Sequence, residues 1–219
     1  MFKKFRLLAI FLGTIFICQA QKLADVFKQM SQKYPKELGV YLKKNTNVKL
    51  DWIKDSLHIS SETYEEIMFL SDLATSLSSQ AVSYSHFNII DKLEAYSLIP
   101  ENGKYKKVLV NNFETKDVVD ESIFYNDVKN IEFNFPGLKA GAIGVVKYIE
   151  KYPDPFILSG HYFTASVPVE LSVFTVTYPK FVEMGFFKHG DTSVISSSFS
   201  ENKTHKTATF TVKEHKRIK

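Results

Sequence analysis

Strict alternation of side chains is clearest in the stretch Lys206-Thr207-Ala208-Thr209-Phe210-Thr211-Val212-Lys213. In an extended chain Ala208, Phe210 and Val212 fall on one face, and the threonines fall on the other. This pattern predicts a strand with one face against a core and the other toward solvent. We therefore expect the fold to be built from strands.

Further segments upstream favour strands as well, and turn signals such as Asn102-Gly103, Pro136-Gly137, Pro153-Asp154-Pro155 and His189-Gly190-Asp191 separate them. The 19 Phe and 11 Tyr of the chain suit half-buried sheet surfaces. Many short strands at this spacing predict an all-β sandwich or barrel, formed by one domain over residues 21–219. The predicted strands are 39–43, 47–53, 57–60, 81–90, 93–99, 106–112, 131–135, 142–152, 160–165, 171–178, 181–188, 193–199 and 206–213.

Two segments carry a helical pattern instead. Leu23, Val26, Phe27 and Met30 recur at helical spacing, and Tyr34-Pro35 ends the pattern, so a short helix is expected there. Residues 63–77 begin with the capping-box pattern Thr63-x-x-Glu66 but also contain the continuous apolar run 67–70. Periodicity does not separate helix from buried strand in this second segment, and we slightly favour the strand.

The N-terminus has the three parts of an export signal: the cations Lys3, Lys4 and Arg6, an apolar run over 7–17, and the tail Cys18-Gln19-Ala20. The run is too short for a membrane-spanning helix, which needs about 20 apolar residues. We expect cleavage between Ala20 and Gln21 and a periplasmic or extracellular location. A lipid anchor on Cys18 is the alternative, and the bulky Ile17 before it disfavours that anchor.

Removal of this signal changes the charge and the chemistry of the chain. The net charge of +4 falls to +1 when the three cations of the signal are subtracted, so nucleic acid and anionic membranes are not favoured as partners. Cys18 is the single cysteine. The mature protein is therefore expected to have no disulfide, no cysteine-based zinc site and no thiol nucleophile.

Short motifs in a fixed order resemble a domain of unknown function found in exported bacterial proteins. They are Tyr34-Pro35, Val40-Tyr41-Leu42, Leu93-Glu94-Ala95-Tyr96-x-Leu98-Ile99-Pro100, Asn102-Gly103-Lys104-Tyr105, Phe124-Tyr125-Asn126-Asp127, Ile131-x-Phe133-x-Phe135-Pro136-Gly137-Leu138-x-x-Gly141-Ala142-Ile143, Phe163, Pro168-Val169 and Tyr178-Pro179.

The resemblance implies an immunoglobulin-like β-sandwich that usually precedes a transglutaminase-like domain. It also implies that the chain, which stops at Lys219 soon after a predicted strand, is a truncated or split form and one sandwich strand short. A missing strand would leave an unpaired edge able to recruit another chain. A transglutaminase-like domain or another exported protein is accordingly the expected partner.

Residues able to carry chemistry are sparse and scattered. The histidines His58, His86, His161, His189, His205 and His215 show no metal-ligand spacing, and Glu65-Glu66 would point to opposite faces of a strand. Phe124, Tyr125 and Asp127 suit either a recognition surface or a core with Asp127 tying a turn. Asn202-Lys203-Thr204 matches a glycosylation pattern that we attribute to chance. We expect no catalytic residue, no metal and no cofactor.

Tyr148, Tyr152, Phe156, Tyr162 and Phe163 surround Pro153-Asp154-Pro155 and suit either core packing or a platform for sugar or peptide. Three functions follow. The first is a non-catalytic accessory or interaction domain, which we favour. The second is a free-standing glycan- or peptide-binding module, which predicts a groove on one sheet. The third is a carboxylate- or metal-dependent hydrolase, which predicts acidic or histidine side chains converging in a pocket.

Overall fold

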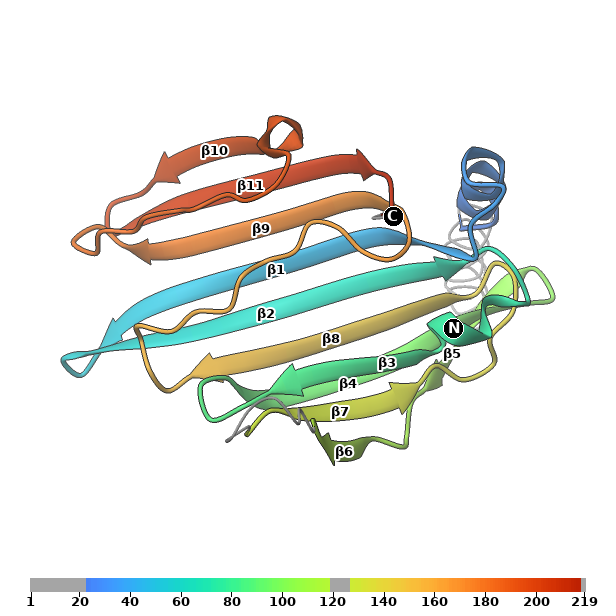
Figure 1. The fold of residues 1–219 in the computed structure, drawn as a ribbon, viewed down its shortest axis with the longest axis horizontal. Helices are drawn as coiled ribbons and strands as arrows, with labels where there is room; N and C mark the ends of the chain where they lie inside the picture. Colours follow the sequence, from blue (N-terminus) through green and yellow to red (C-terminus); the bar gives the residue numbers. More distant parts are fainter. Residues whose placement is uncertain (1–22, 119–126, 218–219) are drawn as a thin grey trace, which may run out of the picture.

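The computed structural model describes residues 23–118 and 127–217, and within them the protein is mostly β with one α-helix at 23–33. Eight strands form one sheet in the order β10-β11-β9-β1-β2-β8-β4-β5, and three form a second sheet in the order β3-β7-β6. Figure 1 shows the two sheets. The elements are β1 (Gly39–Ile53), β2 (Ser56–Phe69), η1 (Ala74–Leu77), β3 (Ser79–Tyr84), β4 (Ile89–Glu101), β5 (Lys104–Leu109), β6 (Glu114–Asp117), β7 (Lys129–Asn134), β8 (Ile143–Tyr152), β9 (Val169–Pro179), η2 (Thr192–Val194), β10 (Ser196–Glu201) and β11 (His205–His215).

Tight turns fix the register of two hairpins in the large sheet. Lys54 and Asp55 join β1 to β2, and Asn102 and Gly103 join β4 to β5, all four with positive φ. Two-residue turns with positive φ at both positions match the twist of the strands they join. β1 and β2 consequently pair over nearly their whole length, with a bulge between Tyr41 and Lys43.

A parallel pair lies in the middle of the large sheet. β1 pairs with β9 in parallel, from Tyr41 opposite Val169 to Lys49 opposite Thr177, whereas the other pairs in this sheet are antiparallel. The backbone N–H of Tyr41 also donates to the carbonyl of Pro168 at 2.9 Å. This pair joins the hairpin β1–β2 to the C-terminal strands β9, β11 and β10.

The three-stranded sheet covers one end of the large sheet, and we call the covered side of the large sheet its inner face. Ile67, Ala95 and Val146 from the large sheet pack in one buried cluster with Val82 and Phe133 from the small sheet. Further along the same face a second cluster contains Val48, Leu50, Ile59, Tyr152, Val176 and Tyr178. The inner face is therefore apolar at both ends.

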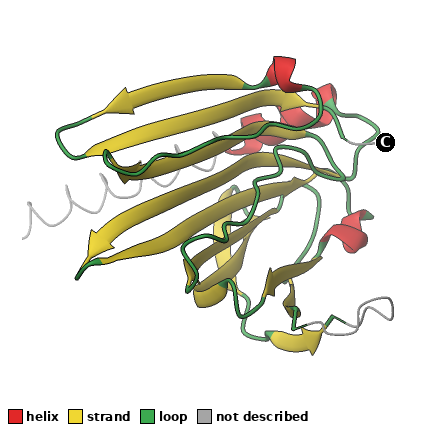
Figure 2. Ribbon diagram, turned by 60° about the vertical axis from the view of Figure 1, so that its left-hand side comes forward, coloured by secondary structure: helices red, strands yellow, loops and turns green. Residues whose placement is uncertain are grey.

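The helix lies on the opposite, outer face (Figure 2). Its residue Met30 is buried with Val40, Met68, Ile143 and Val145, which come from three strands. At the end of the helix the Tyr34 hydroxyl donates to Glu170 Oε1 at 2.5 Å, and burial together with this bond raises the pKa of Tyr34 to about 12. The helix ends at residue 33, as Tyr34-Pro35 predicted.

The expectation of a β fold with a short leading helix is confirmed, whereas an immunoglobulin-like sandwich is not. Immunoglobulin-type domains divide seven to nine strands between two sheets of similar size. Here eight strands lie in one open sheet and three in the other. Residues 63–69 continue β2 and residues 74–77 form η1, so the preference for a strand is confirmed over the first half of 63–77.

Two predicted strands are wrong: residues 160–165 and 181–188 belong to no strand. In the second, burial still alternates, with Val182, Met184 and Phe186 half-buried and Phe181 and Phe187 exposed. Alternation reports an extended chain with one covered side, but a strand also needs a neighbour to receive its backbone hydrogen bonds. The sequence pattern does not predict the short strand β6, because its four residues are all exposed and show no alternation of burial.

Gly144 of β8 allows the two sheets to approach closely. A Cβ at this position would lie 2.6 Å from Cε2 of Phe135. We therefore expect Gly144→Ala to lower the free energy of unfolding by about 1–3 kcal/mol through overpacking, measured by urea denaturation. Gly160→Ala is the matched control, because a Cβ there meets no atom within 4 Å. Equal effects of the two substitutions would contradict this account of the packing.

Candidate functional site

Two loop segments cross the part of the inner face that the small sheet leaves uncovered. The first, residues 153–168, joins β8 to β9 and crosses in front of the strands in Figure 1. The second, residues 180–195, follows β9 and includes η2. Because both cross an apolar surface, their aromatic side chains decide how the surface is closed.

His161 anchors the first crossing segment. Its Nε2 lies 3.0 Å from the Oγ of Ser172, and its ring stacks on Phe174 with a centroid distance of 5.1 Å. Phe163 contacts the same imidazole edge-on at 4.6 Å. Burial, with a smaller contribution from the cation Lys44, lowers the pKa of His161 to about 4. This histidine is therefore neutral at pH 7.

The second crossing segment anchors through alternate apolar residues. Val182, Met184 and Phe186 pack against the cluster of buried residues at this end of the sheet. The ring of Phe186 lies 5.0 Å from that of Phe210 on β11. Phe187, the next residue, is 91% exposed and faces away from the core. Adjacent aromatic residues of this segment therefore lie on opposite sides of the chain, Phe186 against the core and Phe187 in solvent.

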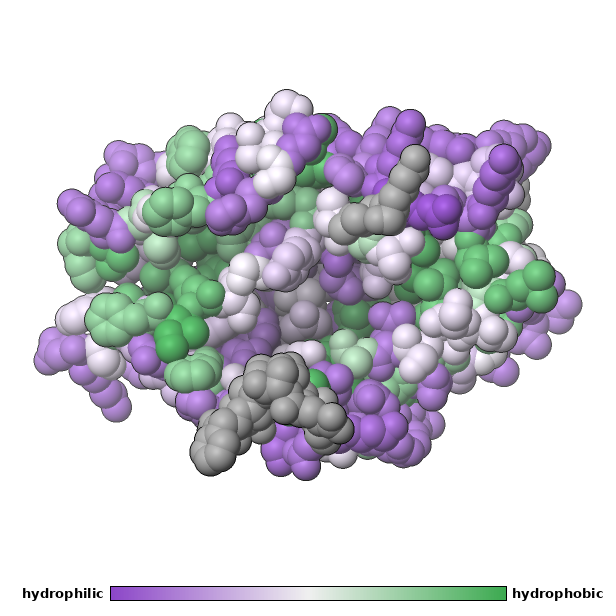
Figure 3. All heavy atoms as spheres, viewed as in Figure 1, coloured by the Kyte–Doolittle hydropathy of each residue, from purple (hydrophilic) through white to green (hydrophobic). Residues whose placement is uncertain are grey.

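A cavity of about 730 Å³ lies between the crossing segments and the strands β9 and β11. Its lining is mainly apolar and aromatic, with Phe163, Phe174, Met184, Phe186 and Phe210 among the residues. Figure 3 shows the hollowed face with apolar residues gathered beside the hollow. Both volume and lining are typical of sites that bind small or extended apolar ligands. Polar groups at its margin are Lys188, His189, Asp191 and His215.

A smaller, polar hollow of about 230 Å³ adjoins this cavity on the other side of the first crossing segment. Lys44 and Glu65 form an ion pair there at 3.2 Å, and burial raises the pKa of the Tyr148 hydroxyl. Glu150 is buried and accepts hydrogen bonds from three side chains, namely Ser61 at 2.7 Å, Asn88 at 3.0 Å and Tyr152 at 3.2 Å. Its carboxylate is thereby fully engaged within the fold.

The aromatic side chains predicted around Pro153-Asp154-Pro155 divide between the core and the surface. Tyr152 is buried, and Tyr148 lines the polar hollow. Phe156 and Tyr162 are 94% and 80% exposed. Phe163 lines the apolar cavity, so these five residues do not form one platform. Phe186 and Phe187 of the second crossing segment complete the cavity, and the sequence suggested no role for them beyond a strand.

The adjacent glutamates point to opposite faces, as expected for a strand. Glu65 pairs with Lys44 at 3.2 Å on the inner face, and Glu66 pairs with Lys43 at 3.6 Å on the outer face. Asp127 accepts a hydrogen bond from the backbone N–H of His86 at 2.8 Å, which confirms that it ties a turn. Phe124 and Tyr125 lie outside the described residues, as do Cys18, Ala20 and Gln21.

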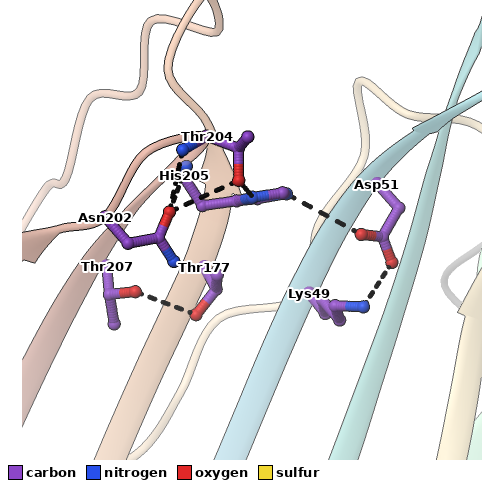
Figure 4. A network of polar contacts seen from close by, with 7 residues as sticks. All are labelled: Lys49, Asp51, Thr177, Asn202, Thr204, His205 and Thr207. Carbon is purple, nitrogen blue, oxygen red and sulfur yellow. Dashed lines mark hydrogen bonds and ion pairs between the residues drawn. The ribbon is translucent and has the colours of Figure 1, made fainter.

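The histidines are distributed over separate contacts. Figure 4 shows one of them on the outer face, where His205 Nε2 lies 3.8 Å from Asp51, which also pairs with Lys49 at 2.8 Å. The Asn202 side chain accepts bonds from the backbone N–H groups of Thr204 and His205, so it caps the β10–β11 turn. Within 23–118 and 127–217, no group of three His, Cys, Asp or Glu side chains could hold a metal ion.

The family model for DUF3857, a domain of unknown function with a solved structure, matches residues 60–219. The chain belongs to the DUF3857 family. No curated protein matches its sequence. Among the residues that the structure describes, no helix of this DUF3857 chain is long and apolar enough to cross a membrane.

One solved structure shares the fold at low sequence identity. A "putative protease" from Parabacteroides distasonis matches with a TM-score of 0.60 and 14% identity, covering 83% of this chain and 36% of that chain. The DUF3857 chain thus spans about a third of that protein. Two further structures match less well. A "putative nutrient binding protein" from Legionella pneumophila has a TM-score of 0.42 and 6% identity, with 83% of this chain and 64% of that chain covered. An M1 zinc metallopeptidase from Deinococcus radiodurans has a TM-score of 0.33 and 14% identity, with 80% of this chain and 38% of that chain covered.

The neutral His161 predicts a pH-dependent stability. Well above pH 6.5 the imidazole is neutral whether the chain is folded or unfolded, so it contributes nothing to the pH dependence there. Below that pH the unfolded chain takes up the proton first, and unfolding becomes easier until the pH falls through about 4. Over the whole interval the free energy of unfolding falls by an amount on the order of 3 kcal/mol.

We therefore expect His161→Gln, which cannot titrate but can still bond Ser172, to lose less stability than the unsubstituted protein between pH 7 and pH 4. Urea denaturation at a series of pH values measures this difference. His58→Gln, at an exposed histidine, is the control and should follow the unsubstituted protein. Parallel pH profiles for all three proteins would show that His161 is not held neutral by the fold.

Proposed function

We propose that this protein is a non-catalytic interaction domain of an exported protein, and that its inner-face cavity binds an apolar segment of a partner. The observation that carries the proposal is the aromatic-lined cavity of about 730 Å³, which opens to the surface beside the exposed ring of Phe187. Soluble proteins seldom leave such a surface open unless it binds something.

The acidic and histidine side chains of the adjoining polar hollow support binding rather than chemistry. Glu150 and His161 are each engaged by neighbouring side chains of the fold, and Glu65 is paired with Lys44. A general acid or base must reach a substrate proton, and a nucleophile needs an adjacent base. The hydrogen bonds of these groups instead hold the strands and the first crossing segment together.

The expected partner is a transglutaminase-like domain or another exported protein. The motif order described above supports the first, and the partial coverage of the Parabacteroides distasonis protein supports a fold that serves as one part of a longer chain. In each case the domain contributes a surface for assembly.

A glycan-binding role is the second candidate, and the polar hollow favours it. Thr46, Thr63, Tyr148 and Glu65 line this hollow, and the exposed ring of Tyr162 lies at its margin. Hydroxyl and carboxylate groups beside an aromatic ring suit the alternating polar and apolar faces of a sugar. Retention of the protein on immobilised peptidoglycan, abolished by Thr63→Val, would favour this role.

The fluorescent apolar dye 8-anilinonaphthalene-1-sulfonate tests the cavity. We expect it to bind the folded protein and to be displaced by the peptide Ac-Ala-Val-Phe-Val-Ala-NH2, but not by Ac-Ala-Ala-Ala-Ala-Ala-NH2. Gly160→Trp places a bulky side chain at a residue that lines both hollows, so it should weaken dye binding at least tenfold. Fluorescence titration measures both effects.

Glu62→Trp is the matched control, because Glu62 is exposed on the same sheet and its neighbours Ser61 and Thr63 face the inner side. It should bind the dye as the unsubstituted protein does. Equal binding by Gly160→Trp, or displacement by both peptides alike, would overturn the proposed function. Thermal melting of each variant verifies that it is folded.

A further inference from the structure

β10 forms an outer edge of the eight-stranded sheet, and within the described residues it pairs only with β11. All six of its residues, Ser196 to Glu201, are exposed. In an antiparallel strand, alternate residues direct their N–H and C=O groups away from the partner strand. The free side of β10 therefore offers backbone donors and acceptors at the spacing of a further strand.

The other edge of this sheet is protected, whereas β10 is not. β5 carries Lys104, Lys106 and Lys107 among its six residues. Lysines on an edge strand oppose pairing with another chain because pairing would crowd and desolvate their charges. β10 reads Ser-Ser-Ser-Phe-Ser-Glu and contains neither lysine nor proline. Of the two edges, only β10 is suited to accept a strand.

The free edge adjoins the apolar cavity. Val194 and Ile195, directly before β10, line the cavity, as does Phe210 of β11. Phe199 of β10 lies edge-on to Phe210, with 6.1 Å between ring centroids, and is 67% exposed. A strand added beside β10 would place every second side chain on this face, next to Phe199.

We propose that β10 binds an extended peptide of the partner by strand addition, with alternate apolar side chains of the peptide reaching over the rim of the cavity. This mode rests on the proposed function and specifies how the partner binds. Backbone hydrogen bonds to β10 supply affinity, and the apolar rim selects the side chains.

The neighbours of β10 define the chemistry of the peptide. On its paired side, Phe199 lies opposite Ala208 and Glu201 lies opposite Lys206. Lys188 donates to the Ser197 hydroxyl at 2.7 Å, which places a cation near the start of the strand. Because the Glu201 side chain is already paired with Lys180 at 3.0 Å, Phe199 is the selective contact, and the fitting peptide carries an apolar residue beside it, as β11 does with Ala208.

The peptide Lys-Thr-Ala-Thr-Phe-Thr-Val-Lys, a copy of residues 206–213, is the probe because β10 already pairs with this sequence. Labelled with fluorescein, it should bind the protein in an anisotropy titration. Lys-Thr-Ala-Pro-Phe-Pro-Val-Lys is the matched control peptide and should bind at least tenfold more weakly, because proline removes backbone donors. Bound probe should also slow amide hydrogen exchange in β10.

Two protein variants locate the binding edge. Ser197 and Ser198 are consecutive, so one of them directs its N–H toward β11 and the other directs it outward. Proline removes the backbone N–H, so one of the variants Ser197→Pro and Ser198→Pro loses a hydrogen bond to β11 and should melt at a lower temperature. The other variant loses only an outward N–H and should keep its melting temperature. The variant with the unchanged melting temperature should bind the probe at least tenfold more weakly than the unsubstituted protein.

The outcomes separate this inference from the proposed function. Unchanged probe binding by the stable proline variant, or no probe binding by the unsubstituted protein, overturns strand addition, while dye binding continues to report on the cavity. If the unsubstituted protein does not bind the dye, the proposed function of the cavity is overturned instead. A dimer in sedimentation analysis that the stable proline variant abolishes would make the occupant a second copy and refute a partner peptide.

Discussion

The large sheet has more apolar inner face than the second sheet can cover, and the rest of the structure follows from this imbalance. Leu50, Val176 and Phe210 are each less than 5% exposed although the three-stranded sheet packs at the other end. An apolar sheet face in water must be covered by another layer. Here the crossing segments 153–168 and 180–195 form that layer.

Loop segments cover a sheet differently from a second sheet. The side chains of two packed sheets interdigitate at a regular spacing. A loop segment that crosses a sheet without pairing to a strand packs only through the side chains that it directs toward the sheet. His161, Phe163 and Phe186 serve in this way. The space left between these contacts is the cavity, so the opening arises directly from the incomplete second layer.

Polar side chains occupy the boundary between the two apolar clusters of the inner face. Thr46 and Thr63 lie 3.2 Å apart across β1 and β2, and Glu150 is satisfied by three donors. Buried polar groups are tolerated when each has its partners. This polar boundary separates two ends of the inner face. At the well-packed end the ring of Phe135 lies directly against Gly144, and the open end is the one that we propose to be the binding surface.

Local pattern determined the parts of this protein that depend on neighbouring residues alone. Alternation at 206–213 identified β11, Asn102-Gly103 identified a hairpin turn, and Tyr34-Pro35 identified the end of the helix. Only the tertiary structure decided which extended segments became strands: residues 181–188 alternate as well, yet they lie across the sheet without pairing. The parallel contact of β1 with β9, the cavity and the free edge of β10 likewise required it, because each joins residues far apart in the chain, and a side-chain period carries no information about which strand lies beside which.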